Sequence, residues 1–418
     1  MSCRWLLVLL LLWSVPAAAD DFIHAKGRDL VEPSGRVFPI RAIGLGNWLM
    51  PEGYMFKFKT ARYPRQITAL VEMALGREEA RRFWDDFRDR YISREDIRLI
   101  RRAGFNTVRV PLHYGLFLGQ HNAFGTDSGR DMTFEGPGWA LVDRLIGWCR
   151  EEGLRVILDL HAAPGGQTGV NHDDGTGFPL VFYVPREERR TTALWLEIAR
   201  RYREEPTVLG YELLNEPIST YHDQDMLNPG LEPFYRRLSE KVRQVDPNHL
   251  IFLAAAQWDQ NFEVFGPPFT RDLVYVYHQF WSPTGLDAIQ DYVNFAMLYQ
   301  APILLGEAGE ASNQWNREYS ALNERFGFGW SFWTYKNLDS PASVVSITPP
   351  PGWAKIAALG SMSAPSLDKV GLTGEEAHTI LRAYLEAIRL DHATFNPCYV
   401  QSLGLGQGMT GPCMAERR

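Results

Sequence analysis

The amino-acid sequence predicts an α/β protein in which a single domain forms an eight-stranded (β/α)8, or TIM, barrel. Two observations carry this prediction: eight short apolar runs rich in β-branched residues, and helix-like segments between most of them. Near-continuous apolar runs are typical of parallel strands that are buried on both faces. The runs span residues 39–46, 105–112, 155–162, 208–215, 250–257, 273–280, 302–309 and 329–336.

The connections between these runs have the apolar spacing of amphipathic helices, as in GWALVDRLIGWCREEG at 138–153. The connection after the first run is longer, and we expect a helical insertion at about 60–103. Within it, Ser93 and Asp96 have the spacing of a capping box. Its dense charge is typical of solvated helix faces rather than of a binding patch. A Pro- and Ser-rich loop follows the eighth run and leads to a last helix near 374–390.

The first 19 residues have the pattern of a secretory signal peptide. Arg4 precedes an apolar run, and the small residues Ala17, Ala18 and Ala19 follow it. The run is too short for a stable membrane span. We therefore expect cleavage after Ala19, a secreted or periplasmic protein, and no membrane association after cleavage.

Behind the signal peptide, the sequence predicts a catalytic domain at 20–395 and a Gly-rich tail at 396–418. Cys398 and Cys413 lie in this tail, where an oxidising compartment favours a disulfide between them. Cys149 is expected to be a buried free thiol. The chain has 43 basic and 50 acidic residues, so its formal charge of −7 argues against a nucleic-acid partner.

Functional side chains of such barrels lie at the carboxyl ends of the strands. The stretch GYELLNEP at 210–217 ends an apolar run on an amide and a carboxylate, and Pro217 stops the strand. We expect the polar residues at the run ends to converge on one pocket. They are Arg109, Asp159, His161, Asn215, Glu216, His278, Glu307, Trp333 and Lys336.

Two carboxylates at the ends of the fourth and seventh runs, Glu216 and Glu307, indicate hydrolysis of a glycosidic bond. One group must be protonated to donate to the leaving oxygen, and the other must be ionised to attack the anomeric carbon. Arg109 would hold Glu307 in its ionised form. A separation of about 5–5.5 Å would predict retention of the anomeric configuration.

From about residue 40 to 336 the sequence resembles glycoside hydrolase family 5, retaining β-glycanases on the (β/α)8 fold. The matching stretches follow the family's order along the chain. They are LGNWLMPEGYMF, YISREDIRLIRRAGFNTVRVPLHY, LDLHAAPGGQ, YELLNEP, VYHQF, LLGEAG and SFWTYK.

This resemblance implies that Glu216 is the acid/base and that Glu307 is the nucleophile. The other implied roles belong to side chains that bind or orient. Arg109 would orient the nucleophile, Asn215 would bond the sugar 2-hydroxyl, His161 and His278 would serve subsites, and Trp333 would form the sugar platform.

One position departs from the family pattern. The family usually has a tyrosine two residues after the sixth-strand histidine, and this sequence has Phe280 there. Tyr277, or another nearby hydroxyl, is the expected replacement. Structural alternatives also exist: Arg109 as an ion-pair partner alone, and His161 and His278 as core histidines. Asp159 is expected to be an ion-pair partner in the barrel wall.

The predicted function is a secreted, monomeric, retaining glycoside hydrolase that needs no cofactor or metal and acts on a β-glucan or oligosaccharide. The linkage is open among β-1,4, β-1,3, β-1,6 and glycosylceramide, although LGNWLMPEG and YISREDI favour the exo-β-1,3-glucanase side of the family. One alternative is a metal-dependent barrel hydrolase that uses His113, His161, His278 and Asp159. Another is a non-catalytic carbohydrate-binding barrel.

Overall fold

A computed structural model of the chain describes residues 21–119 and 132–414, so the predicted signal peptide lies outside the described residues. Eight parallel strands close into a barrel in chain order, and the last strand pairs with the first. Each strand coincides with one of the eight predicted runs, with β4 extending one residue beyond its run, which confirms the predicted fold. The strands are β3 (Arg41–Gly44), β4 (Thr107–His113), β5 (Arg155–Ala162), β6 (Val208–Glu212), β7 (Leu250–Ala254), β8 (Leu273–Phe280), β9 (Ile303–Gly309) and β10 (Gly329–Phe332).

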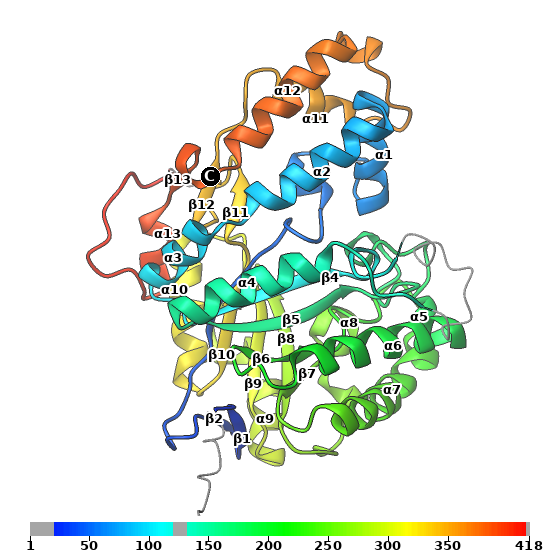
Figure 1. Cartoon of the computed structure of the whole chain (residues 1–418). Helices are drawn as coiled ribbons and strands as arrows, with labels where there is room; N and C mark the ends of the chain where they lie inside the picture. Colours follow the sequence, from blue (N-terminus) through cyan, green and yellow to red (C-terminus); the bar gives the residue numbers. More distant parts are fainter. Residues whose placement is uncertain (1–20, 120–131, 415–418) are drawn as a thin grey trace, which may run out of the picture.

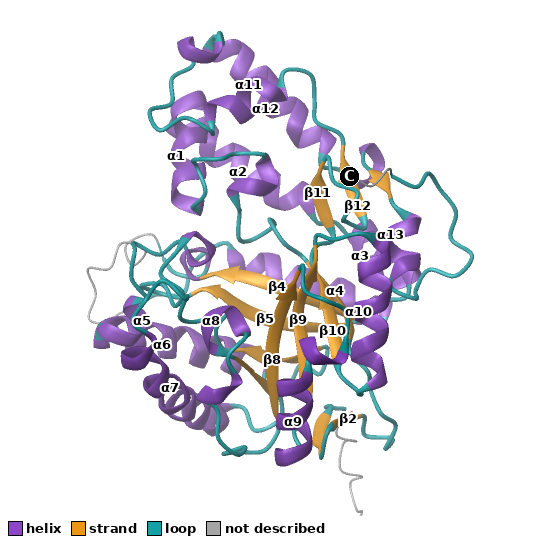
Figure 2. Ribbon diagram, turned by 180° about the vertical axis from the view of Figure 1, so that it is seen from behind, coloured by secondary structure: helices purple, strands orange, loops and turns teal. Residues whose placement is uncertain are grey.

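Helices surround the barrel, as Figure 2 shows. The long ones are α3 (Arg94–Ala103), α4 (Gly138–Glu152), α6 (Pro185–Tyr202), α7 (Gln224–Val245), α9 (Gln290–Tyr299) and α10 (Asn313–Arg325). The short helix α5 (Leu180–Tyr183) precedes α6, and only the four-residue α8 (Ala256–Asp259) and one 3₁₀ turn (Phe262–Val264) lie between β7 and β8. Within residues 21–119 and 132–414, no helix combines the length and apolar character that a bilayer span requires.

The amino-terminal end of the barrel interior is filled by apolar side chains. A small hairpin of β1 (His24–Lys26) and β2 (Asp29–Val31) lies below the barrel in Figure 1. Ile23 and Leu30 belong to the same buried cluster as inward-facing barrel residues such as Phe252. This apolar plug gives the polar groups at the other end of the barrel a packed support.

The predicted insertion at about 60–103 forms three helices, of which only α3 packs as a barrel helix. The other two, α1 (Pro64–Leu75) and α2 (Arg77–Tyr91), pack against α11 (Trp353–Leu359) and α12 (Gly374–Ala387). These four helices, here called the helical lobe, lie together on one side of the barrel (Figures 1 and 2). Stacked aromatic rings hold the lobe together, including Trp353 on Tyr384 at a centroid distance of 4.3 Å.

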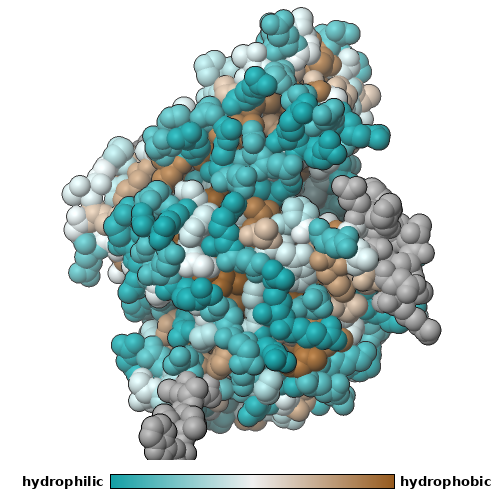
Figure 3. All heavy atoms as spheres, viewed as in Figure 1, coloured by the Kyte–Doolittle hydropathy of each residue, from teal (hydrophilic) through white to brown (hydrophobic). Residues whose placement is uncertain are grey.

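Most charged residues of the insertion lie on solvated faces, as the sequence predicted; Asp96, which is fully buried, is an exception. On α2, Arg82 forms exposed ion pairs with Glu78 and Glu79. Figure 3 shows a largely hydrophilic surface over this side of the molecule. Exposed pairs of this kind contribute little to stability, so the apolar faces carry the packing of the lobe.

Lys336, which the sequence placed at the rim of the pocket, instead ties the helical lobe to the barrel. Its side chain is fully buried, and Nζ lies 2.8 Å from Asp96 Oδ1. It also donates hydrogen bonds to the carbonyl oxygens of Tyr91 and Ile388. The residue belongs to a second, three-stranded sheet of β11 (Lys336–Leu338), β12 (Val345–Ile347) and β13 (Thr394–Phe395). Lys336 is therefore a structural residue.

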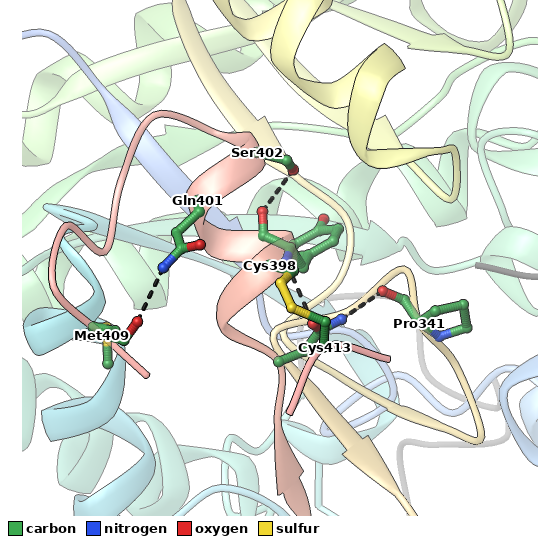
Figure 4. Close-up of a disulfide and its surroundings, with 8 residues drawn as sticks. Pro341, Cys398, Gln401, Ser402, Met409 and Cys413 are labelled. Atoms are coloured by element: carbon green, nitrogen blue, oxygen red, sulfur yellow. Dashed lines mark hydrogen bonds between the residues drawn. A yellow bond between two sulfur atoms is a disulfide. The ribbon is translucent and has the colours of Figure 1, made fainter. Parts of the chain in front are cut away.

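The C-terminal segment packs against the barrel. Helix α13 (Pro397–Ser402) carries Cys398, which forms a disulfide with Cys413 (Figure 4). Tyr399 of the same helix is fully buried, and its hydroxyl lies 3.4 Å from the carbonyl oxygen of Trp333. The tail thus reaches the backbone of one of the predicted site residues. Cys149 is a buried free thiol, as predicted.

Candidate active site

Apart from Tyr277 and Lys336, the predicted site residues come together at the carboxyl ends of the barrel strands. Strands β4, β5, β8 and β9 and the segments that follow β6 and β10 contribute to this group. The members of the group are Arg109, Asp159, His161, Asn215, Glu216, His278, Glu307 and Trp333.

Arg109 lies at the centre of the group and is fully buried. Its Nε and Nη2 atoms lie 2.7 and 2.8 Å from the two carboxylate oxygens of Glu212. Nη1 lies 2.5 Å from Glu307 Oε1. Nη2 also lies 2.7 Å from Asn215 Oδ1 and 3.1 Å from Asp159 Oδ2. Arg109 is therefore an ion-pair partner of three carboxylates and also fixes the orientation of Glu307.

One guanidinium shared by three buried carboxylates shifts the protonation of the whole cluster. Burial lowers the pKa of Arg109, but Asp159, Glu212 and Glu307 outweigh it and raise that pKa well above its usual value. Burial raises the pKa of Asp159 to about 7, against the opposing effect of Arg109. The pKa of Glu212 is raised to about 7 for the same reason. Around neutral pH the cluster therefore holds protons that solvent-exposed carboxylates would have released.

His161 is held by Asp159, the wall ion-pair partner that the sequence predicted. Its Nδ1 atom lies 2.8 Å from Asp159 Oδ2, and its Nε2 atom lies 3.4 Å from Asn215 Nδ2. Burial lowers the pKa of His161 to about 4, although Glu307 opposes the shift. The imidazole is therefore uncharged at neutral pH and available for hydrogen bonding.

Glu216 and Glu307 face one another across His278. His278 Nδ1 lies 3.0 Å from Glu216 Oε1 and 3.9 Å from Glu307 Oε2. An oxygen of each carboxyl group and a nitrogen of the histidine all lie within 4.8 Å of one another. Glu216 is 8% exposed and Glu307 is 6% exposed, so both groups are largely buried yet reachable from solvent.

The backbone around Glu216 departs from ordinary strand geometry. Glu216 and Ile218 have φ angles of 45° and 58°, in the left-handed region that non-glycine residues rarely occupy. The Thr168 hydroxyl donates to the carbonyl oxygen of Glu216, and the Gln167 side chain donates to those of His161 and Asn215. The loop after β5 therefore braces the loop that presents Glu216, and such strained backbone is common at functional sites.

Trp333 forms one wall of the pocket. Its ring lies parallel to the imidazole of His161, with a centroid distance of 5.8 Å. Its Nε1–H donates to the hydroxyl of Tyr54 at 2.6 Å. Gly44 and Gly46 leave room for the ring, because a Cβ atom at either position would lie within 2.8 Å of it.

We expect the Gly46→Ala variant to displace Trp333 and to lower kcat/KM by about 100-fold, since misplacements of about 1 Å have effects of this size. The new Cβ atom would lie 2.5 Å from the indole ring. Steady-state kinetics on an aryl β-glucoside would measure the change. The control is Gly147→Ala on α4, where no atom lies within 4 Å of the new methyl group. Unchanged kinetics in a folded Gly46→Ala enzyme would contradict the role given to Trp333.

The prediction that Tyr277 replaces the family's missing tyrosine is wrong. Tyr277 is fully buried, and its ring stacks on Tyr292 with a centroid distance of 4.0 Å. Its hydroxyl donates to Asn323 Oδ1. The physical reason is strand alternation: because His278 faces the pocket, its neighbour on β8 must face the surrounding helices.

The carboxyl groups of Glu52 and Glu310 and the hydroxyl of Tyr54 also belong to the site, although the sequence pattern did not predict them. Glu52, before the helical lobe, is 4% exposed, and its Oε1 atom has no hydrogen-bonding partner among the described residues. Burial, with Glu307, Glu310 and Glu216 nearby, raises its pKa well above the usual range. Tyr54 hydrogen-bonds the side chain of Glu310, whose pKa burial also raises. The sequence signal for Glu52 and Tyr54 was their place in the stretch LGNWLMPEGYMF, which matches the family.

His172, which the sequence analysis did not assign to the site, lies beside both carboxylates at the mouth. Its Nδ1 atom lies 3.9 Å from Glu216 Oε2 and 4.0 Å from Glu52 Oε2. The side chain is 39% exposed, so it is the most solvent-accessible polar group of this set. Glu52 and Glu216 therefore border a common space.

Several of these groups have the composition of a metal site, which bears on the metal-dependent alternative. Three groups of three residues each place their potential ligand atoms within 4.8 Å of one another. One of these groups is Asp159, His161 and Glu307. The guanidinium of Arg109 already contacts Asp159 and Glu307 and supplies the positive charge that a cation would supply. His113 pairs with Asp174 at 3.4 Å instead of joining these sets. The donor chemistry therefore favours an arginine-compensated carboxylate site.

A (β/α)8 barrel with two facing carboxyl groups at the ends of its fourth and seventh strands has the architecture of a glycoside hydrolase. The model of the family "Cellulase (glycosyl hydrolase family 5)" matches residues 75–339. The chain belongs to glycosyl hydrolase family 5.

Similar proteins include a "Beta-xylosidase" of Phanerodontia chrysosporium, 28% identical over 275 residues, which cover 66% of this chain and 52% of that protein. A "Glucan 1,3-beta-glucosidase" of Lachancea kluyveri is 26% identical over 320 residues, covering 72% and 71% of the two chains. The chain spans about half the length of the first curated relatives that it matches.

Solved structures support the fold. Rutinosidase from Aspergillus niger superposes with a TM-score of 0.56 at 16% identity, covering 72% of this chain and 90% of that one. Thermotoga maritima Cel5A in complex with cellobiose gives a TM-score of 0.51 at 18% identity, covering 73% and 92%.

Proposed function

We propose that this protein is a secreted, retaining β-glycosidase that cleaves β-glucosidic bonds by double displacement. The observation that carries the proposal is the facing pair of Glu216 and Glu307, whose oxygens lie within 4.8 Å of one another and of His278. One oxygen of each group is therefore closer to the other group than the roughly 6.5–9.5 Å that an inverting enzyme needs for its water, which supports the shorter arrangement of a retaining enzyme, roughly 5–5.5 Å.

In the first step Glu307 attacks the anomeric carbon while Glu216 gives its proton to the leaving oxygen. A covalent glycosyl-enzyme forms and the aglycone leaves with that proton. In the second step Glu216 takes a proton from water, and the water oxygen displaces Glu307. Arg109, at 2.5 Å from Glu307 Oε1, orients the nucleophile and stabilises its charge.

The pocket favours the end of a sugar chain over its middle. Glu52 lies near Glu307, Glu310 and Glu216, and burial raises its pKa well above its usual range, while Tyr54 hydrogen-bonds Glu310. A protonated, buried carboxyl group with a free oxygen can both donate to and accept from the hydroxyls of a terminal sugar. We therefore propose exo action, with Glu52 as a binding residue for the non-reducing end.

The proposed substrates are β-1,3-glucans and their oligosaccharides. The stretches LGNWLMPEG and YISREDI favour the exo-β-1,3-glucanase side of the family, and several relatives bear the name glucan 1,3-beta-glucosidase. The signal-peptide pattern and the disulfide of Cys398 with Cys413 support secretion to an oxidising compartment. A panel of β-1,3-, β-1,4- and β-1,6-linked glucose oligomers, a β-xyloside and a glycosylceramide tests this choice. Preferential release of glucose from the β-1,3 oligomers is the expected result.

The mechanism is tested with a 2-fluoro-2-deoxy glucoside that carries a good leaving group. The fluorine slows the second step, so the covalent intermediate accumulates and can be digested and sequenced by mass spectrometry. We expect the label on Glu307, with one sugar per chain. A label on another carboxylate, or inversion of configuration measured by NMR of the first-formed product, would overturn the proposal. Loss of activity with a chelator and its return with zinc would instead favour the metal-dependent alternative.

A further inference from the structure

A group of aromatic side chains lies on the loops that follow three neighbouring barrel strands. We call this group the aromatic rim, and it consists of Phe178 after β5, Tyr221 and His222 after β6, and Trp258 after β7. The ring of Phe178 stacks on His222 with a centroid distance of 5.8 Å. The ring of Tyr221 meets Trp258 edge to face at 5.3 Å. Since Tyr221 and His222 are neighbours in the chain, the two ring pairs adjoin.

Two rings of the aromatic rim are open to solvent. Phe178 is 60% exposed and Tyr221 is 77% exposed. Exposure of two large aromatic side chains forgoes the stabilisation that their burial would give. Single exposed apolar residues are common on protein surfaces, but adjoining ones at the mouth of a pocket are typical of a binding surface. Their partners in each pair, His222 and Trp258, are less exposed and support the two open rings from below.

Both ring pairs are attached to the loop that presents Glu216. His222 Nε2 lies 3.1 Å from the carbonyl oxygen of Thr168, and the Thr168 hydroxyl donates to the carbonyl oxygen of Glu216. The residue before Trp258 donates its backbone N–H to the carbonyl oxygen of Ile218 at 2.8 Å. These contacts fix the aromatic rim beside the acid/base and on the loops that surround it.

The proposed reaction assigns a direction to this side of the site. Glu216 gives its proton to the leaving oxygen, so the sugars that depart with that oxygen must extend past Glu216. The sugar that Glu307 retains lies on the other side of the cleaved bond, over Trp333. A glucan that enters with its non-reducing end therefore leaves the remainder of its chain on the side of the aromatic rim.

We propose that Phe178 and Tyr221 bind the leaving-group units of a β-glucan by stacking on their sugar rings, and that they thereby set the preference for chain length. The C–H groups on the face of a glucose ring carry partial positive charge, which suits the negative face of an aromatic ring. Because His222 and Trp258 already hold the two open rings, little side-chain entropy is lost when a sugar binds. The inference rests on the proposed function, since it takes the leaving-group side from the role of Glu216.

The dependence of kcat/KM on chain length tests this surface in the wild-type enzyme. The substrates are β-1,3-linked glucose oligomers from the dimer to the pentamer, together with a dinitrophenyl glucoside, which has no sugar on the leaving side. We expect kcat/KM to rise by about 10-fold from the dimer to the pentamer, since the added units reach the aromatic rim. An equal kcat/KM for all oligomers of an active enzyme would overturn the proposal and leave the proposed function intact.

Substitutions in the rim test the contribution of each ring. The quantity compared is the pentamer preference, which is kcat/KM for the pentamer divided by kcat/KM for the dinitrophenyl glucoside. We expect Tyr221→Ser and Phe178→Ser each to lower it by about 3- to 10-fold, the usual size of an aromatic contact. Tyr221→Phe should keep it within about twofold, because the ring remains. A loss in Tyr221→Phe equal to that in Tyr221→Ser would overturn stacking as the explanation.

The matched control is Leu298→Ser, which removes another apolar side chain that is 72% exposed. Leu298 lies near the end of α9, which leads into the amino end of β9 and so lies at the opposite end of the barrel from the site. Its pentamer preference should equal that of the wild type. An unchanged pentamer preference in the double variant Phe178→Ser/Tyr221→Ser would overturn the proposal.

Binding without turnover separates this inference from the proposed function. The Glu307→Gln variant lacks the proposed nucleophile, so calorimetry can measure its Kd for the pentamer. Adding Tyr221→Ser to this variant should raise the Kd by about 3- to 10-fold, and an unchanged Kd would overturn the proposal. A wild type that hydrolyses none of the glucosides would contradict the proposed function. The calorimetric comparison would then still decide whether the aromatic rim binds the glucan.

Discussion

Replacement of Glu216 with alanine is expected to lower kcat for substrates with poor leaving groups by about 10²- to 10⁴-fold, the usual contribution of a general acid/base. The leaving oxygen would depart without a proton, and the water of the second step would lack a base. A dinitrophenyl glucoside should retain its first step, so its product should appear as a burst followed by slow turnover. Azide should speed this slow phase and give a β-glucosyl azide, because a small anion fits the space left by the carboxyl group.

The control for this experiment is Glu204→Ala, which removes a carboxylate that is 80% exposed and precedes β6, whereas Glu216 follows that strand. It should leave the kinetics unchanged. If azide has no effect on any substrate of the Glu216→Ala enzyme, the acid/base role of Glu216 is wrong. Formation of an α-glucosyl azide would also contradict retention through a covalent intermediate.

Replacement of Arg109 with leucine is expected to lower the free energy of unfolding by about 3–5 kcal/mol, the usual effect of removing one partner from a buried ion pair. Asp159, Glu212 and Glu307 would then lie in the barrel without a counter-charge. Urea unfolding at neutral pH measures the loss. Activity should also fall, because Glu307 loses the hydrogen bond that orients it.

The pH dependence of this loss has a definite sign. In the folded wild type Asp159 and Glu212 release their protons at about pH 7. Without the opposing effect of Arg109 these two groups should keep their protons to a higher pH in the folded state, whereas the unfolded chain releases them above about pH 4 in both proteins. The difference in stability from the wild type should therefore grow as the pH rises above about 7 and level off below it. Arg109→Lys restores one charge but not the forked geometry, so it should recover only part of the stability. A loss that is independent of pH would contradict the electrostatic explanation.

The sequence predicted the barrel well because its signals are periodic and local. Each strand is buried on both faces, so its apolar run is visible without knowledge of its neighbours. The positions of Arg109, Glu216 and Glu307 follow from the rule that functional groups lie at the carboxyl ends of strands. These residues needed no information about loops.

The residues that the sequence did not reveal come from loops or from the side of a strand. Glu52 and His172 lie in connections whose path depends on contacts with other segments, such as the hydrogen bond from the Thr168 hydroxyl to the carbonyl oxygen of Glu216. The path of such a loop cannot be read from a periodic pattern of apolar residues in the sequence. Tyr277 is a different case, since the alternation of β8 already required it to point away once His278 was assigned to the pocket.

The helical lobe is built from two segments that are far apart in the sequence. Residues 64–91 pack against residues 353–387, and the barrel cannot close until β10 pairs with β3. The ribosome synthesises these segments at widely separated times, so the early segments emerge with their apolar faces exposed. Long-range closure of this kind slows folding. We therefore expect the nascent chain to depend on holding factors until residues 329–387 have emerged.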